Sequence, residues 1–136
     1  MANSAKKIQI IDINLETKPG ALARVYRGFQ ESNISVTASW GYEMGPNQAN
    51  AHFYVQEPKK ALDVLTKMGL KPKTSWAVWC EGKDKAGAYA DALTKIEKAG
   101  VNVHATDAFA LEGQLGSVFF VDEKDLPATC KALGCK

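Results

Sequence analysis

The sequence lacks an excess of charge of either sign. Its 136 residues include 17 basic and 15 acidic side chains, for a net charge of +2, so no electrostatic reason favours a nucleic acid or an anionic membrane as partner. No apolar run approaches the ~18 residues of a membrane span. The polar residues 1–7 are not followed by an apolar stretch of the signal-peptide type. We therefore expect a cytoplasmic protein with neither nucleic-acid nor membrane partners.

Cysteine and histidine are scarce, and neither is spaced for metal binding. Cys80, Cys130 and Cys135 form no CxxC motif and no Cys/His ligand pattern. Cys80 lies in an apolar run and Cys130 on an expected helix face, which is typical of buried thiols. His52 and His104 have no spaced Cys, His or carboxylate companion. We expect neither a metal nor a cofactor.

Apolar periodicity predicts the same order of elements twice along the chain. The first half is expected to hold a strand at 8–15, a helix at 21–32 after the turn at Pro19-Gly20, strands at 34–42 and 49–55, a helix from Pro58 to Gly69, and a short strand at 70–73. The second half is expected to hold a strand at 76–82, a helix with the stripe Tyr89, Ala92, Leu93 and Ile96, strands at 101–109 and 117–121, and a helix at 123–133.

The two halves align as an internal duplication. Gly20 and Gly87 lie 67 residues apart, and so do most matched apolar positions up to the hairpin turn. The offset falls to 66 at Phe53 and Phe119, and to 65 at the closing glycines, Gly69 and Gly134. These shifts fall at turns, where insertions are tolerated. A chance repeat would not keep element order, apolar phase and closing glycines together.

Each copy is expected to fold as an α+β, ferredoxin-like β-α-β-β-α-β unit, an antiparallel sheet with both helices on one face. The expected domains are residues 7–73 and 74–136, with the final strand of the second copy short or missing. Strand alternation in the first copy places a set of residues toward the helices: Ile11, Ile13, Val36, Ala38, Phe53 and Val55.

The sequence resembles the ACT-domain signature in both copies. The segment ETKPGALARVYRGFQESNISVTASW carries it first, GKDKAGAYADALTKIEKAGVNVHATDAFAL repeats it, and VFFVDEKDLPATCKALG resembles the third strand and second helix of the family. ACT domains are regulatory modules that typically bind amino acids where two domains meet. The resemblance implies a stand-alone pair of ACT domains that senses an amino acid or a related small metabolite. It also implies a homodimer, and as partner an enzyme that this protein regulates.

The same resemblance implies where a ligand binds. A glycine lets the backbone approach a ligand, and the following helix N-terminus offers free N–H groups to a carboxylate. The expected first wall is Thr17, Lys18, Gly20, Ala21 and Leu22 in copy one, and Asp84, Lys85, Gly87, Ala88 and Tyr89 in copy two. The expected opposite wall, at the start of the second strand, is Asn33, Ile34 and Ser35, or Val101 and Asn102.

Two alternatives stay open at this stage. Ala86 stands where the first copy has Pro19, and the final strand is reduced. The sequence is therefore also consistent with an interaction module that no longer binds a ligand. An enzyme on the same scaffold, such as an acyl-phosphate hydrolase, would need an arginine in its phosphate-binding loop. Arg24 and Arg27 lie on the expected first helix instead. No catalytic grouping is visible by spacing, and we expect no enzymatic activity.

Overall fold

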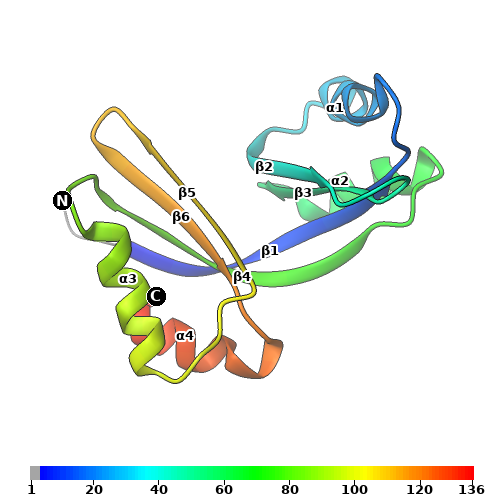
Figure 1. The fold of residues 1–136 in the computed structure, drawn as a ribbon. Coiled ribbons are helices and arrows are strands. Elements are labelled where there is room, and N and C mark those ends of the chain that lie inside the picture. The colour runs from blue at the N-terminus through cyan, green and yellow to red at the C-terminus, as the bar shows by residue number, and fades with distance from the viewer. Residues whose placement is uncertain (1–3) are drawn as a thin grey trace. The chain divides into compact units, whose positions relative to one another are not determined.

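The computed structural model describes residues 4–136 and shows four α-helices and six strands (Figure 1). The elements are β1 (Ser4–Leu15), α1 (Ala21–Glu31), β2 (Val36–Glu43), β3 (Ala49–Val55), α2 (Pro58–Lys67), β4 (Lys73–Lys83), α3 (Ala88–Lys98), β5 (Ala105–Leu111), β6 (Gln114–Phe120), a 3-10 turn (Glu123–Asp125) and α4 (Leu126–Leu133). They follow the predicted order with one exception: the separate strand predicted at 70–73 does not form, because residues 70–72 are a connection and β4 is one continuous strand from Lys73. The strand order is β2-β3-β1-β4-β6-β5. The predicted α+β, ferredoxin-like architecture with antiparallel pairing is confirmed.

The chain divides into two compact units. The first unit is Gln9–Ser75, and the second is Trp76–Lys136 together with residues 4–8 of the described chain. Strands β1 and β4 are neighbours in the strand order, and each continues from one unit into the other. The first part of β1 therefore belongs to the unit built from the second half of the sequence.

The core of the first unit lies between its sheet and the helices α1 and α2. Strand β1 pairs antiparallel with β3, so that Ile11 lies opposite Phe53 and Ile13 opposite Ala51. These residues alternate with polar neighbours, and their inward side chains are almost fully buried. Phe29 of α1 meets Phe53 edge to face with ring centroids 5.2 Å apart, which closes the core beneath the helix.

Strand β2 departs from the predicted alternation. Val36 lies opposite Val55, but Ala38 lies opposite Tyr54, because the register shifts between Val36 and Ala38. A bulge of this kind turns the following residues to the other face of the sheet. The prediction that Ala38 faces the helices is therefore wrong: Ala38 shares the face of Tyr54, away from Phe53.

The second unit repeats the plan with its own core. Strand β4 pairs with β6, and β6 pairs with β5. The core cluster includes Val78, Val121 and Leu126, and Ala5 from the start of β1 joins it. After α4 the chain forms only one isolated parallel bridge, between Ala5 and Cys135. The bridge residue Ala5 belongs to the first part of β1, which lies in this unit.

Candidate ligand-binding site

The loop before α1 turns into the helix at Gly20, as the Pro19-Gly20 dipeptide predicts. Gly20 has φ 87° and ψ −9°, in the left-handed region, and no side chain caps the first turn of α1. The Arg24 N–H donates to the Gly20 carbonyl at 2.9 Å, which begins the helical hydrogen bonds. The N–H groups of the first turn precede the first of these helical hydrogen bonds and have no carbonyl partner within the helix. Their partial positive charge favours an anion.

The loop before α3 has the same backbone although its proline is replaced. Gly87 has φ 84° and ψ −5°, and no side chain caps α3. The Asp91 N–H donates to the Gly87 carbonyl at 2.8 Å. Ala86 in place of proline therefore leaves the geometry of the helix start unchanged, because the left-handed glycine sets the turn.

Two cavities flank the loop of the first unit. One, of about 480 Å³, is lined by four predicted residues, Thr17, Lys18, Ala21 and Leu22, and by the end of β2 and the start of β3, including Tyr42, Glu43 and Asn50. We call this the loop cavity. The other, of about 280 Å³, lies on the helix side and adds Gly20, Arg24, Arg27 and Met68.

Charged groups of both signs line the loop cavity. Glu16 accepts an ion-pair hydrogen bond from Lys18, with 2.8 Å between the lysine Nζ and the carboxylate Oε2. This hydrogen bond, with the lysine charge, lowers the pKa of the exposed Glu16 carboxyl. Glu43 adds a second carboxylate across the cavity. A zwitterion would meet both signs of charge and the open start of α1 here.

Residues 33–35 are not brought to this cavity. Asn33, Ile34 and Ser35 line a separate hollow of about 420 Å³ with Tyr26, Phe29 and Gln30. They follow the C-terminal end of α1, an 11-residue helix that spans about 16 Å. Asn33 has φ 55°, and its N–H donates to the Gln30 carbonyl at 3.0 Å, so it ends the helix as Gly100 does in the second copy.

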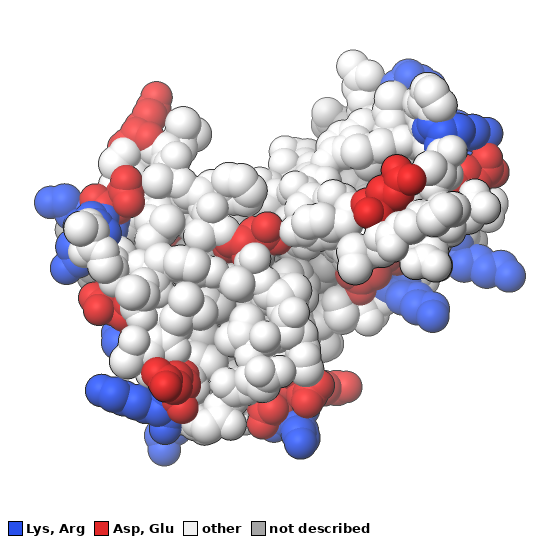
Figure 2. All heavy atoms as spheres, in the orientation of Figure 1, with Lys and Arg blue, Asp and Glu red and all other residues white. Residues whose placement is uncertain are grey.

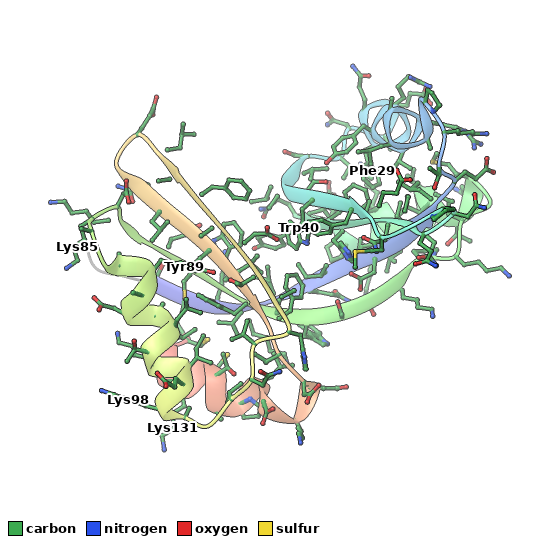
Figure 3. The ribbon with its side chains drawn as sticks, viewed as in Figure 1. Phe29, Trp40, Lys85, Tyr89, Lys98 and Lys131 are labelled. Carbon is green, nitrogen blue, oxygen red and sulfur yellow. The ribbon has the colours of Figure 1, made fainter. Side chains whose placement is uncertain are left out.

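A cavity of the second unit lies at the equivalent of the helix-side hollow. Lys85, Ala88 and Tyr89 line about 310 Å³ together with Lys95, Lys98 and Leu133. Tyr89 points from α3 toward the sheet, whereas Lys85, in the loop before α3, and Lys98, at the end of α3, point outward (Figure 3). The Tyr89 ring stacks on Phe119 at 5.9 Å, and its hydroxyl lies 2.6 Å from the Thr106 Oγ1. Tyr89 is thus anchored where its counterpart Leu22 is exposed.

The remaining predicted residues of the second copy make backbone hydrogen bonds or side-chain contacts outside this cavity. The Asp84 N–H donates to the Gly113 carbonyl at 2.9 Å, and the Val101 N–H to Ile96 at 3.3 Å. The Asn102 Nδ2 lies 3.5 Å from the His104 Nδ1, and the His104 Nε2 lies 2.7 Å from the Asp122 Oδ1. Val101 and Asn102 precede β5, which begins at Ala105 and not at 101 as predicted.

Sequence reasoning missed the hairpin side of the loop cavity. Tyr42, Glu43 and Asn50 line it, but they lie more than 20 residues beyond the loop in sequence. Their position on adjacent ends of β2 and β3 was predictable, whereas their approach to the loop before α1 was not.

The described residues show no metal centre and no single-sign surface in the view of Figure 2. No group of three or more His, Cys, Asp or Glu in residues 4–136 is arranged to hold a metal ion. Acidic and basic side chains mix over α3 and α4, while the β5–β6 hairpin is mostly uncharged on the side shown (Figure 2). None of the described helices is long and apolar enough to span a membrane.

Comparisons with known proteins place this geometry in a family. The model of the ACT domain pair family matches residues 6–129. No curated protein matches the chain. Among solved structures, a protein from Bacteroides thetaiotaomicron superposes with a TM-score of 0.86 at 22% identity, over 96% of this chain and 88% of that one.

Parts of aspartate kinases share the fold. The ligand-free regulatory subunit of aspartate kinase from Thermus thermophilus has a TM-score of 0.68 at 19% identity, over 98% of this chain and 93% of that one. Escherichia coli aspartokinase III, in complex with aspartate and ADP, has a TM-score of 0.65 at 16% identity, over 97% of this chain and 32% of the enzyme chain.

Proposed function

Because the chain belongs to the ACT domain pair family, we propose that it is a regulatory protein, not a catalyst, and that it binds a small amino acid or a related metabolite at the loop cavity of its first unit. The observation that carries the proposal is the start of α1 at this cavity: Ala21 and Leu22 line it, and Gly20, which has no side chain, leaves the first turn of α1 uncapped. Lys18 and the start of α1 would hold a carboxylate. Glu16 or Glu43 would hold an ammonium group.

Residues 33–35 would contact the proposed ligand only if they came from a second ACT unit. They lie at the far end of α1 from the loop cavity, so they cannot contact the same ligand from within one unit. A homodimer in which residues 33–35 of one copy meet the loop of another would complete the predicted opposite wall. An enzyme regulated by this assembly is the further partner that such a protein would have.

The test is thermal unfolding of the whole chain against the twenty L-amino acids, with D-isomers and simple carboxylates as controls. A ligand at about 100 times its dissociation constant adds about 2.7 kcal/mol, which raises Tm by several degrees. We expect a stereospecific rise from one or a few amino acids. Gly20→Val should remove this rise, because the left-handed backbone and the approach to α1 are both lost.

Gly87→Val is the matched control for that variant. Gly87 has nearly the same backbone angles as Gly20, so both substitutions carry the same conformational cost. If Gly20→Val loses the ligand response and Gly87→Val keeps it, the site is in the first unit. Equal responses of the two variants would contradict this assignment.

An interaction module without a ligand is the second candidate function. Phe109 and Leu111, on strand β5 at the end of the strand order, have 70% and 75% of their surface exposed. Such apolar side chains on an outer strand favour contact with another protein. If no compound shifts Tm while light scattering shows a dimer at micromolar concentration, this second function is supported and ligand binding is not.

A further inference from the structure

All four helices end in the same hydrogen-bonded turn. The residue five positions beyond the acceptor donates its N–H to the acceptor's carbonyl: Ile34 to Phe29 at 2.9 Å, Leu70 to Leu65 at 3.1 Å, Val101 to Ile96 at 3.3 Å, and Cys135 to Cys130 at 2.9 Å. The residue before each donor has a positive φ: Asn33, Gly69, Gly100 and Gly134. This is the Schellman motif, which brings the side chains of its two outer residues into contact.

In three of the four turns the two outer residues are apolar, and in the fourth they are two thiols. Phe29 and Ile34, Leu65 and Leu70, and Ile96 and Val101 fill the first three pairs. At the end of α4 the Cys135 Sγ lies 2.6 Å from the Cys130 Sγ. Leu65 and Leu70 occupy the equivalent places in the first copy, so the chain itself shows what a purely structural pair looks like.

From this geometry we propose that Cys130 and Cys135 form a reversible dithiol–disulfide pair that fastens the C-terminal residues onto strand β1. Cys135 bridges to Ala5, and the Lys136 N–H donates to the Ala5 carbonyl at 3.2 Å. A disulfide would tie this bridge to the end of α4. The same segment reaches the second-unit cavity, because Leu133 and Ser4 both line it.

A low-molecular-weight disulfide such as oxidised glutathione supplies the oxidant. One cysteine thiolate attacks a sulfur of the glutathione disulfide, forms a mixed disulfide and releases one glutathione. The other cysteine thiolate then attacks the protein sulfur of the mixed disulfide and releases the second glutathione. The protein loses two electrons, the glutathione disulfide gains them, and the two thiol protons leave with the two glutathione thiols.

Burial makes this exchange slow at neutral pH. Desolvation first, and the contact with Cys130 second, raise the pKa of the Cys135 thiol to about 12. Desolvation raises the pKa of the Cys80 thiol to about 11. Since the thiolate is the reacting form, the rate of disulfide formation should rise with pH. Both members of the pair are only half-buried, so a small reagent reaches them.

Peptide mapping tests the pairing directly. Trypsin places the three cysteines in three peptides, residues 74–83, 125–131 and 132–136. After incubation of the native protein with oxidised glutathione at pH 8.5, alkylation and digestion without reductant, we expect 125–131 and 132–136 to appear as one disulfide-linked species. Alkylated or glutathione-bound Cys130 and Cys135, or a link to the peptide of Cys80, would overturn the proposal.

Melting temperature provides the second readout, independent of ligand binding and of the proposed function. The oxidised protein should melt on the order of 5 °C above the reduced protein, because the bond removes freedom from the unfolded chain. Cys80→Ser is the matched control and should keep both the link and the shift. The double variant Cys130→Leu with Cys135→Leu copies the first-copy pair and should show no response to oxidant. A shift that persists in the double variant, or vanishes in Cys80→Ser, contradicts the assignment.

Discussion

At the residue scale, two glycines and one asparagine explain why the two copies share the same turns before and after their first helix, although the surrounding residues differ. Gly20 and Gly87 are left-handed, and an added Cβ would meet no atom within 4 Å at either position. Their requirement is therefore conformational and not steric. Asn33 takes the left-handed place that Gly100 takes in the second copy, because a short polar side chain tolerates this region.

Gly20→Ala should lower the free energy of unfolding by about 1–2 kcal/mol, which is the cost of placing a Cβ in the left-handed region. Urea denaturation measures the change. Gly87→Ala should cost the same amount, since its backbone angles are nearly identical. A cost at only one of the two glycines would contradict the view that backbone conformation alone requires them.

Lys18→Met should raise the pKa of Glu16 toward its ordinary value. The hydrogen bond and charge of Lys18 hold that pKa down, and the carboxyl is fully exposed. A lowered folded pKa contributes stability above the unfolded pKa and loses it as pH falls through the folded value. Full exposure keeps the effect on stability small. Carboxyl-carbon NMR titration is the measurement, and an unchanged Glu16 pKa would refute the pairing.

At the element scale, a polar network joins strands on the outer face of the first unit. The His52 Nδ1 lies 2.5 Å from the Asp12 Oδ1, and the Ser75 hydroxyl donates to the other carboxylate oxygen at 2.7 Å. The His52 ring stacks on Trp40, with centroids 6.1 Å apart, and both rings belong to the face that the bulge in β2 determines. The network therefore links β1 to β3 and to the start of β4.

Asp12→Ala should destabilise the protein by about 1–3 kcal/mol, because it leaves two part-buried donors without their acceptor. Asn14→Ala is the control: Asn14 lies on the same strand and face but is exposed, and its loss should change stability by less than about 0.5 kcal/mol. Chemical denaturation of both variants measures the difference. Equal costs would mean that the strand position matters and the hydrogen bonds do not.

At the scale of the whole molecule, duplication produces two units with similar backbones and different interiors. Three aromatic rings, Tyr26, Phe29 and Phe53, meet edge to face in the first core. In the second unit Phe119 stacks on Tyr89 instead. The shared plan is set by periodicity and caps, whereas each core is filled by its own residues.

Phe53→Ala should lower the free energy of unfolding by about 3–5 kcal/mol, since it opens a cavity beneath two rings. Phe109→Ala removes the same side chain from a position that is 70% exposed. It should cost less than about 0.5 kcal/mol. Denaturant titration compares the two, and similar losses would show that Phe109 is covered in solution.

Much of the fold could be predicted because local signals carry it. Repeated periodicity, turn residues and closing glycines gave most of the element order, the duplication and the turn at Pro19-Gly20. The loop side of the candidate site was visible for the same reason, in residues 17–22. The bulge after Val36 was not visible, because it depends on which residues of β3 lie opposite. Residues 33–35 were grouped with the loop by resemblance, although the length of α1 separates them within a unit.

The sequence by itself determined that this protein is a duplicated α+β chain with an equivalent glycine before the first helix of each copy, and it carries the resemblance to a pair of ACT domains. Only the tertiary structure decided that residues 4–8 complete the second unit, that Ala38 faces away from the helices, and that Tyr42, Glu43 and Asn50 enclose the loop cavity. The physical reason is that turns and helix ends depend on a few neighbouring residues. Strand partners and cavity walls depend on contacts between residues that are far apart in the chain.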